Sequence, residues 1–313
     1  MKNVTTIKSL SAAMVAGILI LSSCSKKDEA LNSGDTQNVN SESVSDSYTS
    51  ETADMSTVVV SSVSATRYGT TGRVSGAITG LEAIDSRLTG AEITLTPGQG
   101  STKDNPNGII IINFGTTGVT TNGVLRKGRI LISYSGRKNA GQSVRTLSYD
   151  GYSRNGVAFS NTMYFSITNR GTLGTLDSTH FTHRLSGGLL TFPDGSTIVR
   201  ESDYNITLEF DATTHFLKTV TLFADAGTNS ALHSATGTTR ALKEYQMDIT
   251  EPLVYKVECL ATKNYFAVSG EKTIKVDNKV TYTIDYGDGT CDNTVTISVG
   301  GKSATVTVNG DGN

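Results

Sequence analysis

The sequence predicts an all-β protein built from antiparallel strands, in a sandwich-like domain or in two stacked β-units. Apolar and polar residues alternate with a period of two in several segments, for example over residues 129–134, 204–210 and 280–284. Such alternation is typical of strands that have one buried and one solvated face. The chain also contains 46 Thr and 34 Ser among its 313 residues. Because β-branched Thr fits the solvated face of a strand, this abundance agrees with the same fold class.

Charge and composition exclude several classes of protein. The formal net charge is −2, so the chain lacks the basic excess that a nucleic-acid partner requires. Only 4 Pro residues and no Gly-x-y period are present, which excludes collagen-like and proline-rich chains. The absence of Trp disfavours a surface that stacks on sugar rings, although 12 Tyr residues offer an alternative.

Residues 1–23 have the organisation of a signal peptide. Lys2 and Lys8 precede an apolar run over 12–21, which is too short to span a bilayer as a helix. The tetrad Leu-Ser-Ser-Cys that ends at Cys24 resembles a bacterial lipobox. The resemblance implies cleavage before Cys24 and attachment of acyl chains, including palmitate, which anchor a protein stably to a membrane. The alternative is an ordinary signal peptide with an incidental cysteine.

Residues 24–64 are predicted to form the lipidated cysteine and a flexible acidic tether. After Cys24 the segment has seven acidic residues against two lysines, and Tyr48 is its one aromatic residue. Such a composition buries too little apolar surface to offset the entropy of ordering. The tract Lys27-Asp28-Glu29 is similar to the surface-export signal of Bacteroidota lipoproteins. We therefore expect an outer-membrane protein at the cell surface, with the periplasmic face as the alternative.

Residues 65–313 are expected to form the all-β globular region, with a sub-boundary near 180–195 as an open alternative. The pairs Asp277-Asn278 and Gly300-Gly301 each separate two strand-like segments, which predicts two-residue hairpins. No segment shows the apolar period of a long helix. The best candidates for short helices are residues 81–88 and 217–226.

Several motifs together resemble an uncharacterised family of Bacteroidota lipoproteins. They are Gly-Ile-Ile-Ile-Ile-Asn-Phe-Gly at 108–115, the segments 122–130 and 134–137, residues 189–195, and Ile-Asp-Tyr-Gly-Asp-Gly-Thr-Cys-Asp-Asn at 284–293. The last of these is the most specific. The resemblance covers roughly residues 90–313 and implies lipoprotein status and an all-β fold. It supplies no activity and no catalytic residue.

Cys259 and Cys291 remain once Cys24 is assigned to the lipid anchor. An even pair in an exported chain predicts a disulfide. Two buried free thiols and a reactive or metal-binding pair are the alternatives. Cys259 ends a strand-like segment, and Cys291 precedes another.

Four oxygen-bearing residues crowd into a glycine-rich loop: Asp285, Asp288, Asp292 and Asn293. Clustered carboxylates and a flexible turn are what Ca²⁺ requires, so this loop is a weak candidate for a calcium site. The spacing differs from that of an EF-hand loop. The favoured alternative is a hairpin turn in which the Asp side chains accept hydrogen bonds from nearby backbone amides. No other cofactor is expected.

Further candidates are weaker. Asp177-Ser178-Thr179 is similar to the acceptor motif of Bacteroidota O-glycosylation, with Ser178 as the acceptor. His180 and His183 would point to opposite faces of a strand, which disfavours a shared metal. The sequence contains no Gly-x-Ser-x-Gly elbow, no His-Glu-x-x-His motif and no P-loop.

The sequence thus predicts a non-enzymatic, lipid-anchored protein with a role in binding, adhesion or envelope structure. Its expected partners are the membrane, through the lipid anchor, and a glycan or protein at the cell surface. The alternative is a polysaccharide-acting hydrolase or a glycan-binding module on a β scaffold. Inward-facing carboxylates in one open cleft would favour the hydrolase. A flat or convex sheet surface with an exposed Tyr would favour binding.

Overall fold

The computed structural model describes most of the chain after the first 32 residues. The described residues are 33–66, 68–69, 72–73, 75–137, 141–171, 178–211, 217–224, 234–262, 267–292 and 294–307. The predicted signal peptide, Cys24 and the first part of the predicted tether lie outside this range. So do Asp177, His215, His233 and Asn293.

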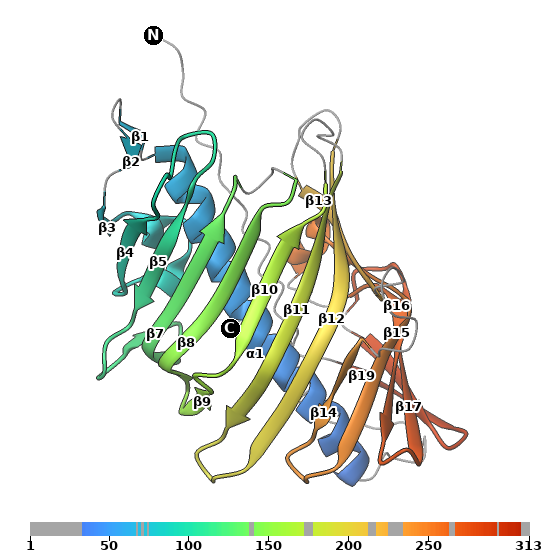
Figure 1. Cartoon of the computed structure of the whole chain (residues 1–313). Helices are drawn as coiled ribbons and strands as arrows, with labels where there is room; N and C mark the ends of the chain where they lie inside the picture. Colours follow the sequence, from blue (N-terminus) through green and yellow to red (C-terminus); the bar gives the residue numbers. More distant parts are fainter. Residues whose placement is uncertain are drawn as a thin grey trace.

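Seventeen of the strands in the described residues belong to one sheet, which follows the chain in an up-and-down order (Figure 1). The first half of the chain supplies β1 (Tyr68–Gly69), β2 (Gly72–Arg73), β3 (Gly76–Ile78), β4 (Glu92–Pro97), β5 (Asn107–Asn113), β6 (Val119–Thr121), β7 (Val124–Ser135), β8 (Val144–Arg154) and β9 (Val157–Phe159). The second half supplies β10 (Tyr164–Asn169), β11 (Ser178–Thr191), β12 (Thr197–Phe210), β13 (Leu217–Ala224), β14 (Ala235–Thr238), β15 (Glu244–Lys256), β16 (Ser269–Val276), β17 (Val280–Asp288), β18 (Thr294–Val299) and β19 (Lys302–Thr307).

Every strand pairing in the described residues is antiparallel. The pairings run from β3 through β4, β5, β7, β8, β10 and β11 to β12. The two halves of β12 then pair with β13 and β14, and both of these also pair with β15. From β15 the sheet continues through β16, β17 and β18 to the edge strand β19. β1 and β2 form a separate two-stranded ribbon.

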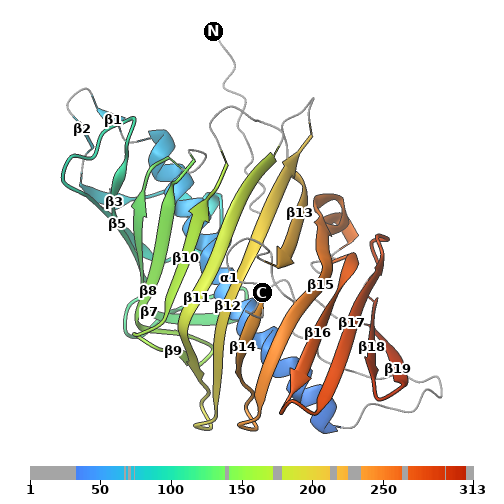
Figure 2. The ribbon, with the colours of Figure 1, turned by 45° about the vertical axis from the view of Figure 1, so that its right-hand side comes forward.

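A long helix, α1 (Ser33–Thr66), crosses one face of this sheet diagonally. Figures 1 and 2 show its N-terminal end beside the strands β14–β17 and its C-terminal end beside β3–β5. The short 3₁₀ turns η1 (Leu81–Ala83) and η2 (Ser86–Leu88) lie against its C-terminal half, and η3 (Val257–Thr262) follows β15. Among the described helices, none is apolar over enough of its length to cross a bilayer.

The prediction of a flexible tether is wrong over residues 33–64, because these residues belong to α1. The helix is polar, yet most of its described side chains are buried. Its hydroxyl groups are satisfied locally, since Thr49 Oγ1 donates to the Ser45 carbonyl at 3.0 Å and Ser62 Oγ to the Val58 carbonyl at 2.9 Å. Its carboxylates find partners on the sheet. The composition of residues 33–64 indicates disorder only when the segment is taken alone, because its burial and its counter-charges come from the sheet.

The all-β antiparallel class is confirmed. All described strands except β1 and β2 form one continuous sheet, and α1 packs where the second sheet of a sandwich would lie. β11 pairs with β12 up to Thr191, with one register shift between Leu185 and Gly188, and a short turn joins the two strands, so the sheet continues through the candidate sub-boundary near 180–195. The two predicted hairpins are present, with positive φ at both turn residues of Asp277-Asn278 and of Gly300-Gly301. Of the candidate short helices, 81–88 contains η1 and η2, but 217–224 is the strand β13, a correction.

The core lies between α1 and the facing side of the sheet. Alternate strand residues are buried there, as on β7, where Ile130 and Ile132 are fully buried while Arg129 is exposed. Aromatic rings continue the core along the helix, where Tyr48 stacks on Phe159 with ring centroids 6.3 Å apart. The period-two pattern in the sequence is therefore the pattern of contact with α1.

Candidate functional site

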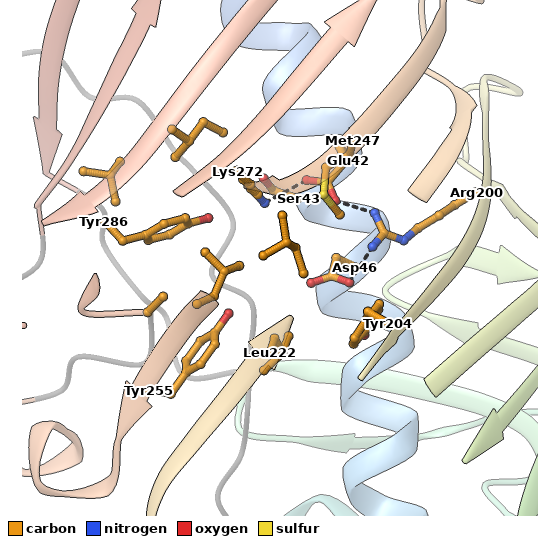
Figure 3. A pocket seen from close by; sticks show the side chains of 15 residues that line it. Glu42, Ser43, Asp46, Arg200, Tyr204, Leu222, Met247, Tyr255, Lys272 and Tyr286 are labelled. Carbon is orange, nitrogen blue, oxygen red and sulfur yellow. Dashed lines mark hydrogen bonds and ion pairs between the residues drawn. The ribbon is translucent and has the colours of Figure 1, made fainter. Parts of the chain in front are cut away.

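A cluster of four charges, three of them buried and the fourth, Asp46, half-buried, joins the N-terminal half of α1 to the sheet (Figure 3). Glu42 and Asp46 lie one turn apart on the helix, and Arg200 on β12 faces both. Arg200 Nη2 donates to Asp46 Oδ1 at 2.8 Å, and Lys272 Nζ on β16 donates to Glu42 Oε2 at 2.9 Å. Arg200 Nη1 also donates to Glu42 Oε1. Two negative and two positive charges thus compensate each other inside the protein.

The electrostatics of this cluster differ between its two carboxylates. Burial by itself raises the pKa of Glu42, but the charges of Lys272 and Arg200 outweigh this effect and hold its pKa below the usual range. Burial raises the pKa of Asp46, and the nearby charge of Glu42 adds to the increase. The cations of the cluster therefore favour the ionised form of Glu42, whereas burial disfavours the ionised form of Asp46.

A small cavity lies beside this cluster. Its walls are largely apolar and come from β13, β15, β17 and β18, including Leu222, Met247 and Ile284. Tyr255 and Tyr286 also line it, and burial raises the pKa of both phenols. The cavity volume of about 40 Å³ has room for a few water molecules at most. The arrangement presents paired charges and protonated phenols, not a free acid and base flanking a substrate-sized space.

A second buried cluster holds the middle of α1. Glu51 accepts from Arg126 Nε of β7 at 2.8 Å, and Arg154 Nε of β8 lies 2.5 Å from its other carboxylate oxygen. The guanidinium of Arg154 also lies 4.5 Å from the centroid of the Tyr48 ring. One carboxylate of the helix therefore forms ion pairs with two arginines of the sheet.

A third group of charges lies towards the C-terminal end of the helix. Arg87 in η2 forms a forked pair with Asp85, through Nε to Oδ1 at 2.9 Å and Nη2 to Oδ2 at 2.8 Å. Its Nη1 lies 3.9 Å from Asp54 of α1. Arg145 on β8 donates to Thr57 Oγ1 of the helix at 3.1 Å, and burial lowers its pKa to about 10.

The opposite face of the sheet carries an open groove of about 340 Å³, and most of the residues that line it are polar or charged. Thr236 and Thr238 of the short strand β14 lie between longer side chains on neighbouring strands, among them Glu201 of β12 and Gln246 of β15. Lys275 of β16 and Asn278 of the following turn also line it. These side chains alternate with buried neighbours on their own strands, so they face away from α1. An exposed Tyr, Tyr164, lies on the same outward face, on β10.

The two cysteines that remain after Cys24 are joined in the structure. Cys259 of η3 and Cys291 of the loop after β17 form a disulfide with a Cα–Cα distance of 5.1 Å. This is the pairing that the even cysteine count predicts. It ties the end of β15 to the hairpin of β17 and β18, and it rules out the free-thiol alternatives for this pair.

Removal of the disulfide is expected to destabilise the protein. The bond closes a loop with a sequence separation of 32, for which the chain-entropy model gives about 3–4 kcal/mol. A Cys259→Ser, Cys291→Ser double variant should therefore unfold at a lower urea concentration than the wild-type chain. A Cys259→Ala, Cys291→Ala variant controls for the polarity of the replacement. Equal midpoints for the double variants and the oxidised wild-type chain would contradict the prediction.

The candidate calcium loop is a set of local turns in the structure. Asp285, Asp288 and Asp292 each accept a hydrogen bond from the backbone amide two residues further on, at 2.8, 3.1 and 3.0 Å. Among the described residues, one group of three possible metal ligands comes together, formed by Glu258, Cys259 and Cys291. The two sulfur atoms of this group are bonded to each other in the disulfide. The described Asp residues therefore match the alternative of a hydrogen-bonded turn.

The remaining candidates lie at the surface or beside the core. Ser178 begins β11 opposite Glu209 of β12, and its side chain lies outside the described set. His180 is exposed, with Nδ1 2.9 Å from Thr207 Oγ1. His183 lies between the rings of Phe165 and Tyr204, on the other face of the strand, as its spacing from His180 predicts.

His183 is expected to make the protein less stable in mild acid. Burial and the charge of Arg145 lower its folded-state pKa to about 3, whereas an unfolded His titrates near 6.5. Between these values the unfolded chain binds the extra proton, so the free energy of unfolding falls as the pH falls through this window. A His183→Gln variant should lose this part of the dependence between about pH 6.5 and pH 3. The check is urea denaturation across this pH range, with His180→Gln as the exposed control; identical pH profiles for all three chains would contradict the prediction.

Sequence reasoning missed the buried ion pairs. The acidic composition of the segment predicts solvated carboxylates, and no motif marks their partners Arg126, Arg154, Arg200 and Lys272. One signal was present: Arg200 and Lys272 occupy inward positions of alternating segments, where an apolar residue is expected. A cation at such a position indicates a buried anion opposite it.

No family model matches the sequence, and no significantly similar curated protein or solved structure was found. The resemblance to Bacteroidota lipoproteins therefore remains a prediction.

Proposed function

We propose that this protein is a lipid-anchored, non-catalytic binding protein of the outer membrane that is displayed at the cell surface. The lipobox ending at Cys24 and the following Lys27-Asp28-Glu29 tract support the anchor and its location. The acyl chains on Cys24 would supply the membrane attachment, and the described part of the chain would supply the binding surface.

One observation carries the binding role: the contrast between the two faces of the sheet. On the inner face the carboxylates of α1 are neutralised by cations of the sheet and lie beside a cavity of about 40 Å³. On the outer face the groove of about 340 Å³ is open and is lined by side chains that reach solvent. A ligand-sized space with convergent polar groups therefore lies on the face away from the buried charges.

The chemistry of the groove favours a ligand rich in hydroxyl groups, such as a glycan. Glu201 supplies acceptors, and one of its oxygens already accepts from the Gly187 amide at 2.7 Å. Lys275 supplies donors, and the amides of Gln246 and Asn278 supply both donors and acceptors. Sugar hydroxyls act as donor and acceptor at once, so they complement this mixed set.

A Lys275→Ala variant tests the groove. We expect it to weaken glycan binding at least about tenfold, because a hydrogen bond to a charged group contributes roughly 1.5–3 kcal/mol. Lys218→Ala on β13 is the matched control, since Lys218 is an exposed lysine outside the groove. Binding to a panel of neutral and acidic oligosaccharides is measured by calorimetry. Equal affinities for both variants would contradict the assignment, and cleavage of a bound glycan would favour the hydrolase.

Two cell-based experiments test the anchor and the location. Metabolic labelling with an alkyne analogue of palmitate should mark the wild-type chain but not a Cys24→Ser variant. Protease treatment of intact cells should remove the described region from the surface. Protection until lysis would instead place the protein on the periplasmic side and contradict the export role of Lys27-Asp28-Glu29.

A further inference from the structure

The start of α1 fixes which end of the sheet lies next to the membrane, if Cys24 is lipidated as proposed above. Only eight residues separate Cys24 from Ser33. Fully extended, this connection spans about 30 Å. The 34 residues of α1 extend for about 50 Å. The anchor therefore reaches the end of the sheet where the helix begins, and the end beside β3–β5 lies a helix length further away (Figure 1).

Three turns gather at the end where α1 begins. The β14–β15 turn contacts the helix through the Arg240 amide, which donates to Ser41 Oγ at 3.4 Å. The side chain of Arg240 donates to Ser196 Oγ at 2.8 Å, which joins this turn to that of β11–β12. On its other side, the Asp277 amide donates to the Glu244 carbonyl at 2.8 Å, which joins it to the β16–β17 turn. The turns thus form one contiguous tip (Figure 2).

This tip exposes apolar side chains. Leu242 in the β14–β15 turn is 75% exposed, the highest value among the large hydrophobic residues of the described chain. It also adopts a φ of 59°, in the left-handed region that a leucine disfavours. Val280, at the start of β17, is 38% exposed. The positive φ belongs to the hairpin turn, because the Leu242 amide donates to the Thr239 carbonyl at 2.8 Å. The turn leaves the leucine side chain in solvent, where it is available to an apolar surface.

We propose that this tip, formed by the β14–β15 and β16–β17 turns, docks on the lipid surface of the bilayer that carries the Cys24 anchor. Leu242 and Val280 enter the boundary between headgroups and acyl chains. The charges around them are balanced, because Arg240 pairs with Asp194 and Lys243 lies 4.0 Å from Asp277. The tip therefore fits a zwitterionic lipid surface better than a strongly anionic one.

The absence of Trp from the native chain allows a direct test. A Leu242→Trp variant of the full, lipidated chain has a single indole at the tip. It is reconstituted into phosphatidylethanolamine–phosphatidylcholine vesicles that contain brominated acyl chains. We expect blue-shifted emission and strong quenching of this indole. Val280→Trp is a second reporter at the same tip. Ile109→Trp is the matched control, because Ile109 is 46% exposed on β5 at the distant end of the sheet, and its emission should remain unquenched.

The outcomes separate this inference from the anchor on which it rests. Co-sedimentation of wild-type chain with vesicles, lost in Cys24→Ser, verifies the anchor independently of any Trp reporter. Unquenched Leu242→Trp and Val280→Trp in vesicle-bound protein would overturn the docking while leaving the anchor intact. Quenching of Ile109→Trp in place of the tip reporters would show that the opposite end faces the bilayer. Failure of the wild-type chain to co-sediment would overturn both.

Discussion

Replacing Arg200 with methionine is expected to destabilise the fold by about 3–5 kcal/mol, because it leaves Asp46 without a cation and Glu42 with Lys272 alone. Arg200 is 1% exposed and hydrogen-bonds to both Glu42 and Asp46. Methionine retains much of the apolar stem, so the loss reports the charge and its hydrogen bonds more than the packing. The measurement is the free energy of unfolding in urea. Since one cation links two carboxylates to β12, the N-terminal half of α1 should also exchange its amides faster.

The matched control for this prediction is Arg184→Met on the neighbouring strand. The side chain of Arg184 is 67% exposed and lies 3.9 Å from Asp203, so its removal should cost less than about 1 kcal/mol. A double variant, Arg200→Met with Asp46→Leu, leaves Glu42 paired with Lys272 and should recover most of the lost stability. If Arg200→Met were no more destabilised than Arg184→Met, the cluster would not hold the helix.

The sheet could be predicted because its signals are local. Alternation on segments such as 280–284 and the pair Asp277-Asn278 specify strands and turns within a few residues of each other. The antiparallel meander then follows from short connections between successive strands. The number of strands in the sheet could not be predicted from local signals, because it depends on whether a second sheet or another element covers the inner face.

The helix could not be predicted because its determinants are far away in the sequence. Glu42 pairs with Lys272 across 230 residues, and Glu51 pairs with Arg126 across 75. Within residues 33–64, composition alone indicates disorder, since Ser and Thr are modest helix formers and the segment carries a net negative charge. The same small side chains allow strands to pack closely around the helix. The segment becomes ordered only with the sheet that supplies its counter-charges.

In the candidate site, too, the features with a signal in the sequence could be predicted, and those that depend on the assembled sheet could not. The pairing of Cys259 with Cys291 was predictable from counting, since only one internal pairing remains once Cys24 is assigned to the proposed lipid anchor. The groove around Thr236 was not predictable, because its lining comes from four elements that meet only in the sheet. Alternation can place Glu201 and Lys275 on the outward face of their strands, but it cannot give their register.

Replacing Glu51 with glutamine is expected to cost about 3–5 kcal/mol, because it leaves Arg126 and Arg154 as two like charges in the core. Both arginines are at most 3% exposed, and Glu51 is 2% exposed. Glutamine conserves the shape of the side chain, so the urea midpoint reports the lost charge. Glu82→Gln is the control, since Glu82 is an exposed carboxylate of η1 and should shift the midpoint little.

A triple apolar variant decides what the Glu51 cluster contributes. In one outcome, the variant Glu51→Leu, Arg126→Met, Arg154→Met is as stable as the wild-type chain or more stable. In that case the charges specify where α1 packs on the sheet without adding net stability, as is common for buried ion pairs. If the triple variant is as unstable as Glu51→Gln, the hydrogen bonds themselves stabilise the fold. A Glu51→Gln chain as stable as the wild type would contradict both outcomes.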